Sequence, residues 1–97
     1  MRFRAELAPG VLRDMQRSYS QEDVADFFRE LDRVCDAPLK QSQIYFDPEF
    51  SRYAYRWFPF GVGVEKVAVF HFDGRVVRVL TCRLSRPPRP RNPANGG

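Results

Sequence analysis

The sequence predicts an α+β fold with an N-terminal strand, two helices and a three-stranded antiparallel meander, followed by a disordered tail rich in proline and arginine. Three observations support this prediction. Residues 20–36 carry apolar side chains at helical spacing, and residues 53–84 form strand-like runs separated by turn residues. Residues 86–97 contain four prolines and no large apolar side chain. We therefore expect one domain over residues 1–85 and a disordered arm over residues 86–97.

The N-terminal segment alternates apolar and charged side chains. Phe3, Ala5 and Leu7 alternate with charged residues, which predicts a short strand with one buried face. Pro9 suits the first turn of a helix, where its missing N–H costs nothing. The apolar residues that follow at helical spacing are Val11, Leu12, Met15 and Tyr19.

The second helix is the clearest prediction in the chain. Ser20 and Asp23 resemble a capping box, and the acidic residues of the first turns suit the positive end of the helix dipole. Pro38 ends the helix, because the residue before a proline is pushed out of the helical region. The expected apolar stripe consists of Val24, Phe27, Phe28, Leu31, Val34 and Cys35. Cys35 on this stripe is expected to be buried rather than reactive.

Strands are expected after the second helix. Residues 44–46 form either a short strand or a loop packed on the core, and residues 53–60 alternate as a strand. Residues 64–72 are apolar on both faces, which is typical of a central strand. Asp73 and Gly74 predict a two-residue hairpin turn, with residues 75–84 as the partner strand.

Composition narrows the class of protein. With 97 residues, of which 43% are hydrophobic, the chain can bury one small core. It lacks an apolar run of the roughly 20 residues that cross a membrane, and it lacks a secretory signal pattern. Two cysteines and one histidine are too few for a disulfide framework or a His-rich metal site. We expect a cytoplasmic protein without a metal, membrane contact or small-molecule cofactor.

Positive charge accumulates toward the C-terminus. Residues 1–50 hold seven basic and ten acidic side chains, residues 51–85 hold six and two, and residues 86–97 hold three and none. An anionic partner would therefore approach the second half. The alternative for the body of the protein is that surface charges serve only solubility.

Arginines of the strand region are candidates for phosphate binding, because their guanidinium groups form paired hydrogen bonds with phosphate oxygens. They include Arg52, Arg56 and Arg78. Three aromatic residues share one face of the first of these strands, namely Tyr53, Tyr55 and Trp57. Aromatic residues on one face of a strand usually belong to the core, and this arrangement would direct Arg52 and Arg56 to the open face.

Two further side chains could take part in chemistry. His71 is the default general base, because histidine exchanges protons readily near neutral pH. It shares a face with Val67 and Val69, which favours a partly buried core histidine. Cys82 stands beside Arg83, and a neighbouring cation can lower the pKa of a thiol.

The order of these elements resembles that of RelE/ParE-superfamily toxins. The opening RFRAELAP (residues 2–9) and the run VLRDM (residues 11–15) are similar to the start of these proteins. The long amphipathic helix that ends at Pro38 and the closing hairpin over residues 67–83 are also similar. Family members belong to bacterial toxin–antitoxin pairs. RelE-like members cut mRNA on the ribosome, ParE-like members poison DNA gyrase, and a cognate antitoxin protein neutralises either.

The resemblance also implies roles for individual residues. Arg56 and Arg78 would stabilise phosphate charge, and His71 or a tyrosine would assist proton transfer. Arg83 is the alternative match for the arginine of the last strand. Leu84 stands where RNA-cutting members usually carry Tyr or His. Further candidates for nucleic-acid binding are Arg52, Lys66, Arg83 and Arg86.

Three functional hypotheses follow. The first is a RelE/ParE-like toxin that acts as a metal-independent endoribonuclease or as a gyrase-directed poison. The second is a non-catalytic module that binds nucleic acid through a basic sheet face and the arginine-rich arm. The third is an interaction domain with an acidic protein partner. A catalytic site requires that Arg56, Arg78 and His71 share one solvent-open face of the sheet.

Overall fold

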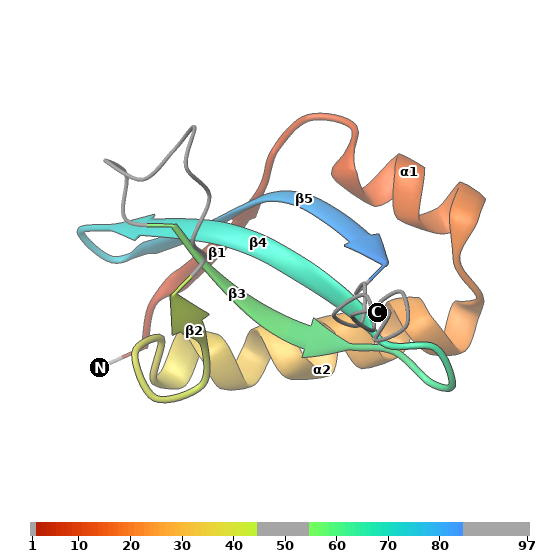
Figure 1. Ribbon diagram of the computed structural model, residues 1–97. Helices are drawn as coiled ribbons and strands as arrows, with labels where there is room; N and C mark the ends of the chain where they lie inside the picture. Colours follow the sequence, from red (N-terminus) through yellow and green to blue (C-terminus); the bar gives the residue numbers. More distant parts are fainter. Residues whose placement is uncertain (1, 45–54, 85–97) are drawn as a thin grey trace, which may run out of the picture.

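The protein is an α+β domain in which two helices cover one face of a five-stranded mixed sheet (Figure 1). The computed structural model describes residues 2–44 and 55–84. Along the chain the elements are β1 (Arg4–Leu7), α1 (Val11–Ser18), α2 (Gln21–Asp36), β2 (Gln43–Ile44), β3 (Tyr55–Phe60), β4 (Lys66–Asp73) and β5 (Val76–Leu84). The arm expected over residues 86–97 lies outside the described residues.

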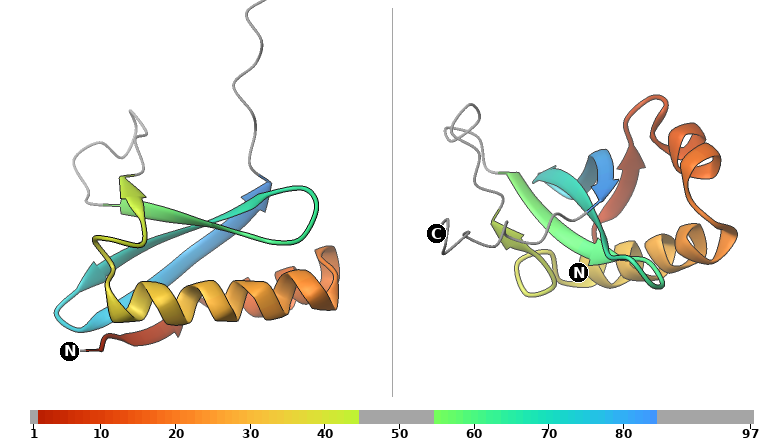
Figure 2. Two further views of the ribbon diagram at one scale, coloured as in Figure 1. Left: turned by 90° about the horizontal axis from the view of Figure 1, so that it is seen from below. Right: turned by 45° about the vertical axis from the view of Figure 1, so that its right-hand side comes forward.

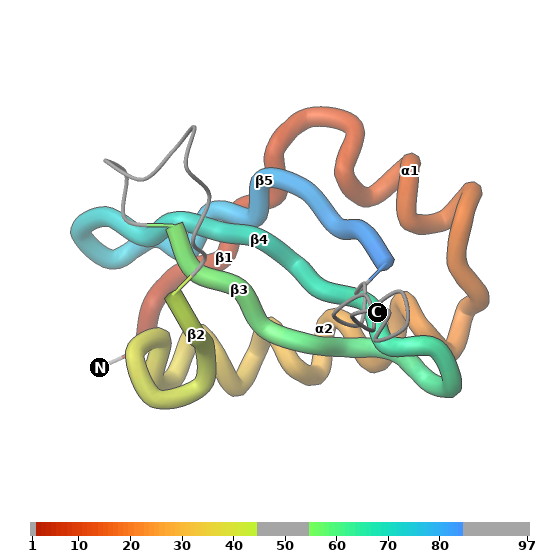
Figure 3. The backbone as a smooth tube through the Cα atoms, in the orientation of Figure 1, coloured from red at the N-terminus to blue at the C-terminus, as the bar shows by residue number. Residues whose placement is uncertain are grey.

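The sheet has five strands rather than the three expected. The three expected antiparallel strands lie in its middle, and β1 and β2 form its two edges. Its order is β1-β5-β4-β3-β2, so β4 is the middle strand, as its two apolar faces predict. Strands β3, β4 and β5 pair antiparallel in sequence order, and the two-residue β2 extends the sheet beside β3. The N-terminal strand β1 pairs in parallel with β5, the last described strand. Figure 3 traces how the chain brings these two distant segments together.

The boundaries of α2 confirm the sequence prediction. The Ser20 hydroxyl accepts a hydrogen bond from the Asp23 backbone N–H at 3.1 Å, and the helix ends at Asp36. Its apolar stripe differs from the prediction on one side, because Phe28 is 42% exposed and Asp23 is buried. The side chains of α2 that lie in the core are Phe27, Leu31, Val34 and Cys35.

The core lies between the sheet and the helices (Figure 2). Phe27 of α2 stacks on Phe58 of β3 with ring centroids 5.9 Å apart, and Phe58 contacts Phe70 of β4 at 5.8 Å. Val77 and Val79 of β5 complete this apolar layer and are fully buried. Burying side chains of this size supplies most of the free energy that holds the helices on the sheet, at about 1.5–3 kcal/mol each.

This packing fixes the two faces of the sheet. Phe58 and Phe60 of β3 point toward the helices, and strand alternation therefore directs Tyr55 and Trp57 to the opposite side. We call this opposite side, which carries Tyr55, Trp57, His71 and Arg78, the helix-free face. The expectation that Tyr55 and Trp57 belong to the core under the helices is wrong, because Phe58 and Phe60 take those positions. Tyr53 lies outside the described residues.

A buried ion pair joins α2 to the first residue of β4, and its hydrogen bonds extend to the loop between β3 and β4. The Lys66 ammonium lies 2.9 Å from an Asp23 carboxylate oxygen, and both side chains are more than 90% buried. The other oxygen of Asp23 accepts a hydrogen bond from the Val62 backbone N–H at 2.8 Å, and Lys66 donates to the Val64 carbonyl at 2.7 Å. Lys66 is therefore engaged inside the fold, and this placement does not fit the role in nucleic-acid binding that the sequence suggested.

The described helices do not include a membrane-spanning segment, because neither reaches the length and apolar character that a bilayer requires.

The Asp23–Lys66 pair predicts a specific pH dependence of stability. The hydrogen bond from Val62 and the charge of Lys66 hold the pKa of Asp23 below its usual 3.8. The ionised carboxylate therefore stabilises the fold above about pH 4, and this contribution disappears as the pH falls further. We expect Asp23→Asn to lower the melting temperature by several degrees at neutral pH, because it leaves the Lys66 charge buried without a counterion. Circular dichroism melts over a pH series would measure this difference.

The difference between the two proteins should shrink below about pH 4, where the wild-type carboxylate becomes protonated. Glu22→Gln, which removes a charge from the exposed surface of the same helix turn, is the matched control and should change the melting temperature little. A constant difference between wild type and Asp23→Asn down to pH 2 would contradict the assignment.

Candidate functional site

Four polar and aromatic side chains form one row across the helix-free face. Glu6 of β1 is paired with Arg78 of β5, Arg78 with His71 of β4, and His71 with Tyr55 of β3. Side chains directly opposite each other on neighbouring strands have Cβ atoms about 4.5–5.5 Å apart. We call these four residues the polar row. The sheet thereby brings together a carboxylate, a guanidinium, an imidazole and a phenol from four separate strands.

An ion pair forms one end of the polar row. Arg78 donates two hydrogen bonds to the same carboxylate oxygen of Glu6, from Nε at 3.1 Å and from Nη2 at 2.8 Å. These bonds hold the pKa of Glu6 below its usual 4.5. A second guanidinium, that of Arg4, lies 3.4 Å from the other carboxylate oxygen. The group carries two positive charges and one negative charge, so it can attract an anion while keeping Arg78 in place.

Two rings form the other end of the polar row. His71 and Tyr55 make an edge-to-face contact with ring centroids 6.2 Å apart, and both residues are half-buried. His71 shares its face with Val67 and Val69, as expected. His71 is therefore partly buried, as expected, but this face is not the one under the helices, so it does not belong to the core. The imidazole is placed on the same face as Arg78, where it can exchange protons with a molecule bound there.

A second row beside the polar row is mostly apolar. Trp57 of β3 is paired with Val69 of β4, and Val69 with Thr81 of β5. Trp57 is half-buried, and Val69 is only 5% exposed. The next pair along the strands is Val67 with Arg83, whose side chain also belongs to the helix-free face. The face therefore combines cations with aromatic surface.

Arg56 lies apart from this site. It follows the alternation of Phe58 and is paired with Phe70, so it belongs to the side of the sheet that the helices cover. Its Nε donates to the Ser42 hydroxyl at 2.6 Å, and its Nη2 donates to the Ser42 carbonyl at 2.9 Å. The Leu39 carbonyl accepts a further bond from Nη2 at 3.3 Å. Arg56 thus fastens the segment after α2 to β3, and it does not join His71 and Arg78.

The remaining expected binding residues divide into three groups. Arg83 is exposed, and its pairing with Val67 places it on the helix-free face. Lys66 is buried against Asp23. Arg52 and Arg86 lie outside the described residues. The structure therefore brings His71, Arg78 and Arg83 to one face and separates Arg56 and Lys66 from them.

Glu6 is the member of the polar row that the sequence reasoning missed. Its position on the polar side of an alternating strand was visible, but the parallel pairing of β1 with β5 was not. The ladder pairs the third residue of β1 with the third residue of β5, which is what aligns Glu6 with Arg78. One weak signal was available, because Glu6 is the acidic residue of a strand that otherwise carries only basic charges.

The cysteines do not provide a nucleophile. Burial raises the pKa of Cys82 to about 12, and the thiol lies 3.6 Å from the Met15 sulfur. The Arg83 neighbour therefore does not make Cys82 a thiolate at neutral pH. Cys35 is buried as expected, and burial raises the pKa of its thiol as well. Across residues 2–44 and 55–84, His, Cys, Asp and Glu side chains do not gather in groups of three that could hold a metal ion.

Comparison with known proteins does not identify a family. No model of a known protein family matches the chain, and no curated protein matches it in sequence. The chemistry of the polar row is therefore the basis of the functional proposal below.

Proposed function

We propose that the protein binds single-stranded RNA on its helix-free face and cleaves it without a metal, as a RelE/ParE-like toxin of a bacterial toxin–antitoxin pair. One observation carries this proposal: Arg78, whose guanidinium is of a kind that binds phosphate, is paired with His71, whose imidazole is of a kind that transfers protons. The toxin assignment rests on the resemblance of the sequence to that superfamily. A cytoplasmic location and a cognate antitoxin partner belong to the same proposal.

The cleavage step uses the ribose hydroxyl of the RNA as nucleophile. His71 accepts the proton of the 2′-OH while its oxygen forms a bond to the adjacent phosphorus atom. Arg78 binds the phosphate oxygens and stabilises the negative charge that develops on them. The bond from phosphorus to the 5′-oxygen breaks, and a proton from the Tyr55 hydroxyl or from water neutralises this leaving oxygen. The products are a 2′,3′-cyclic phosphate and a 5′-hydroxyl end.

Glu6 acts as a positioning residue in this scheme. Its carboxylate is held by Arg78 and lies near Arg4, and its lowered pKa makes it a weak base. Because Glu6 accepts two bonds from one guanidinium, it fixes the direction in which the remaining N–H groups of Arg78 point. A correctly oriented donor costs no reorganisation when charge develops on the phosphate.

Trp57 and Tyr55 favour RNA in single-stranded form. Unstacked bases can lie on aromatic side chains, and each such contact contributes about 1–3 kcal/mol. Both residues face the same side as His71. An RNA strand that crosses the sheet can therefore place a phosphate at Arg78 and a base on an aromatic ring.

A second candidate function is binding without cleavage. The hydrogen bonds between Arg78 and Glu6 favour it, because a guanidinium that already holds a carboxylate has fewer donors left for a transition state. In this case Arg4, Arg78 and Arg83 attract a nucleic-acid backbone or an acidic protein partner. A gyrase-directed toxin is the corresponding non-nuclease form of the first proposal.

The cleavage proposal predicts a growth phenotype. Expression of the intact chain in a bacterial host should arrest growth and produce cleaved mRNA. With purified protein and single-stranded RNA, His71→Ala should reduce the cleavage rate by about 10²–10⁴-fold and Arg78→Ala by about 10²–10³-fold. Arg13→Gln, which removes an exposed cation from α1, is the matched control and should leave the rate unchanged.

Unimpaired growth at high soluble expression would contradict the toxin assignment. Growth arrest with intact mRNA would instead favour the gyrase-directed form. Retained cleavage in His71→Ala, with the cyclic phosphate still formed, would exclude the assigned role of His71.

The binding proposal predicts a strong dependence on salt. Affinity for single-stranded RNA should fall as salt rises, with a slope of about 0.7 per phosphate contact on a double-logarithmic plot. Arg78→Ala should reduce this slope by about that amount, and removal of residues 86–97 should weaken binding to all sequences alike. Fluorescence anisotropy at several salt concentrations measures both effects. Affinity that does not change with salt would contradict binding through phosphate contacts.

A further inference from the structure

The helix-free face is divided lengthwise into two strips of different chemistry. Strand alternation directs three guanidinium groups of β1 and β5 to this face, those of Arg4, Arg78 and Arg83. It directs the half-buried rings of Tyr55 and Trp57, which belong to β3, to the same face. We call these two sets the cationic strip and the aromatic strip. Strand β4 lies between them, so β5 and β3 are about 9–10 Å apart.

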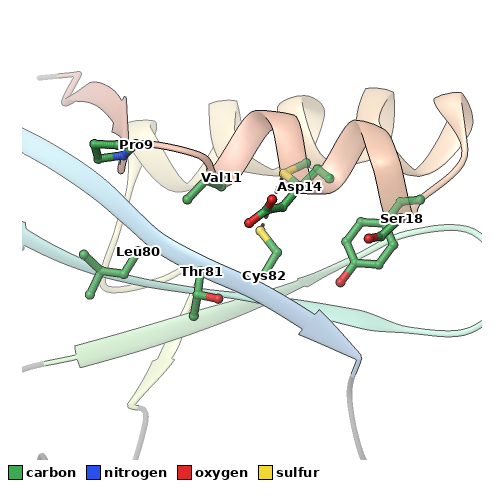
Figure 4. A pocket seen from close by; sticks show the side chains of 9 residues that line it. Pro9, Val11, Asp14, Ser18, Leu80, Thr81 and Cys82 are labelled. Carbon is green, nitrogen blue, oxygen red and sulfur yellow. Dashed lines mark hydrogen bonds between the residues drawn. The ribbon is translucent and has the colours of Figure 1, made fainter.

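Figure 4 shows where β5 divides this face from the helices. The Cys82 side chain is directed toward α1, where its sulfur lies 3.6 Å from the Met15 sulfur, and the Thr81 side chain is directed away from α1. Arg83, two residues after Thr81, follows the same alternation. The cationic strip therefore runs along β5 from Arg78, past the exposed Thr81 side chain, to Arg83.

Trp57 is suited to stack on a flat ring. It is directly opposite Val69 of β4, and it is the largest side chain that the described strands place on the helix-free face. Val69 is only 5% exposed, although neither helix covers this face. An indole ring that leans across β4 accounts for this burial and leaves its outer face open, in agreement with the half-buried state of Trp57. Such a ring is held in place before a nucleobase arrives, which lowers the cost of ordering it on binding.

The spacing of the rows fits an extended nucleic-acid strand. Side chains on one face of a strand recur every second residue, so successive rows are about 6.6 Å apart. In a duplex the phosphates of one strand advance by only about 3.4 Å per nucleotide. Bases that follow the rows are therefore unstacked from each other, and an unstacked base is free to lie on an aromatic side chain. Trp57 is one row from His71, so a base there belongs to a nucleotide beside a phosphate at Arg78.

We propose that a single strand of RNA lies lengthwise on the helix-free face, with its backbone on the cationic strip and one base stacked on Trp57. This arrangement rests on the proposed function, because RNA is the ligand. Beyond that function, it defines the path of the strand and a subsite for one base next to the phosphate that Arg78 binds. A purine is preferred in this subsite, because its two fused rings cover more of the indole than the single ring of a pyrimidine does. A duplex cannot bind in this way, because its bases remain stacked on each other.

The test uses the fluorescence of the intact chain, because Trp57 is its single tryptophan. The probes are 2′-O-methyl hexaadenylate, 2′-O-methyl hexauridylate and an abasic hexamer of equal charge, none of which offers a 2′-OH for cleavage. At saturation hexaadenylate should quench the fluorescence more than hexauridylate, and the abasic hexamer should bind without quenching. Fluorescence anisotropy of labelled probes measures binding independently. Salt-sensitive binding of hexaadenylate without quenching would overturn the stacking and leave the proposed function standing, whereas absence of binding by all three probes would overturn both.

Variants of Trp57 separate stacking from a structural role of the ring. Trp57→Ala should weaken hexaadenylate binding about 5–150-fold, as expected for one stacked base, and should leave the abasic hexamer unaffected. Trp57→Leu keeps an apolar cover on Val69 without a π face and should lose affinity likewise, which provides a second measurement if Trp57→Ala does not fold. Trp57→Phe should restore most of the affinity, and Phe28→Ala, which removes a 42% exposed ring from α2, is the matched control. Equal losses for hexaadenylate and the abasic hexamer, or no loss for either, would overturn the stacking subsite.

Variants of the cationic strip test the direction of the strand. The dinucleotide 2′-O-methyl-ApA has one phosphate and reaches Arg78 alone, whereas hexaadenylate reaches Arg83 as well. Arg83→Gln should therefore weaken hexaadenylate binding about two- to fivefold and leave the dinucleotide unchanged, and Arg78→Ala should weaken both. Arg13→Gln on α1 is the matched control and should change neither affinity. Unchanged hexaadenylate binding in Arg83→Gln would overturn the lengthwise path.

Discussion

The packing of α2 on one face of the sheet is the constraint on which the other features depend. Phe27 fits against Phe58 and Phe70, and this contact decides which side of every strand is buried. Once Phe58 faces the helix, alternation along β3 and β4 places Tyr55 and His71 on the opposite side. The polar row is therefore a consequence of core packing. A shift of one residue in β3 would exchange Arg56 with Tyr55 and dismantle the site.

The parallel pairing of β1 with β5 joins two segments that are far apart in the sequence. It places the residues nearest the N-terminus beside those that end the described part of the chain, so Glu6 contacts Arg78 across 72 positions of sequence. A contact of this sequence separation costs loop-closure entropy, which the packing of the rest of the domain has to offset. The geometry of the polar row thus depends on the whole domain, because no single hairpin contains it.

Signals between neighbouring residues were sufficient to predict the helices and strands, but not to predict which face of each strand is buried. The cap at Ser20 and the proline after α2 each act on neighbouring residues, and both are confirmed. A two-residue hairpin turn also forms, but its loop residues are Gly74 and Arg75, because Asp73 still pairs with Val76. The faces of β3 could not be predicted, because Tyr55, Trp57, Phe58 and Phe60 make both sides aromatic. The packing of α2 on the sheet decided which of the two sides of β3 is buried. Hydrophobic pattern alone gave the wrong side for Arg56, which is one of the three expected catalytic residues.

The irregularity in β5 explains how two arginines at odd spacing reach one face. The ladder to β4 shifts register between Val69 and Phe70, which are paired with Thr81 and Val79, and this leaves Leu80 as the extra residue. Strict alternation from Arg78 would direct Arg83 into the core side. With the extra residue, Arg83 joins Arg78 on the helix-free face and Cys82 turns toward Met15. One bulge therefore determines the cationic character of the open face.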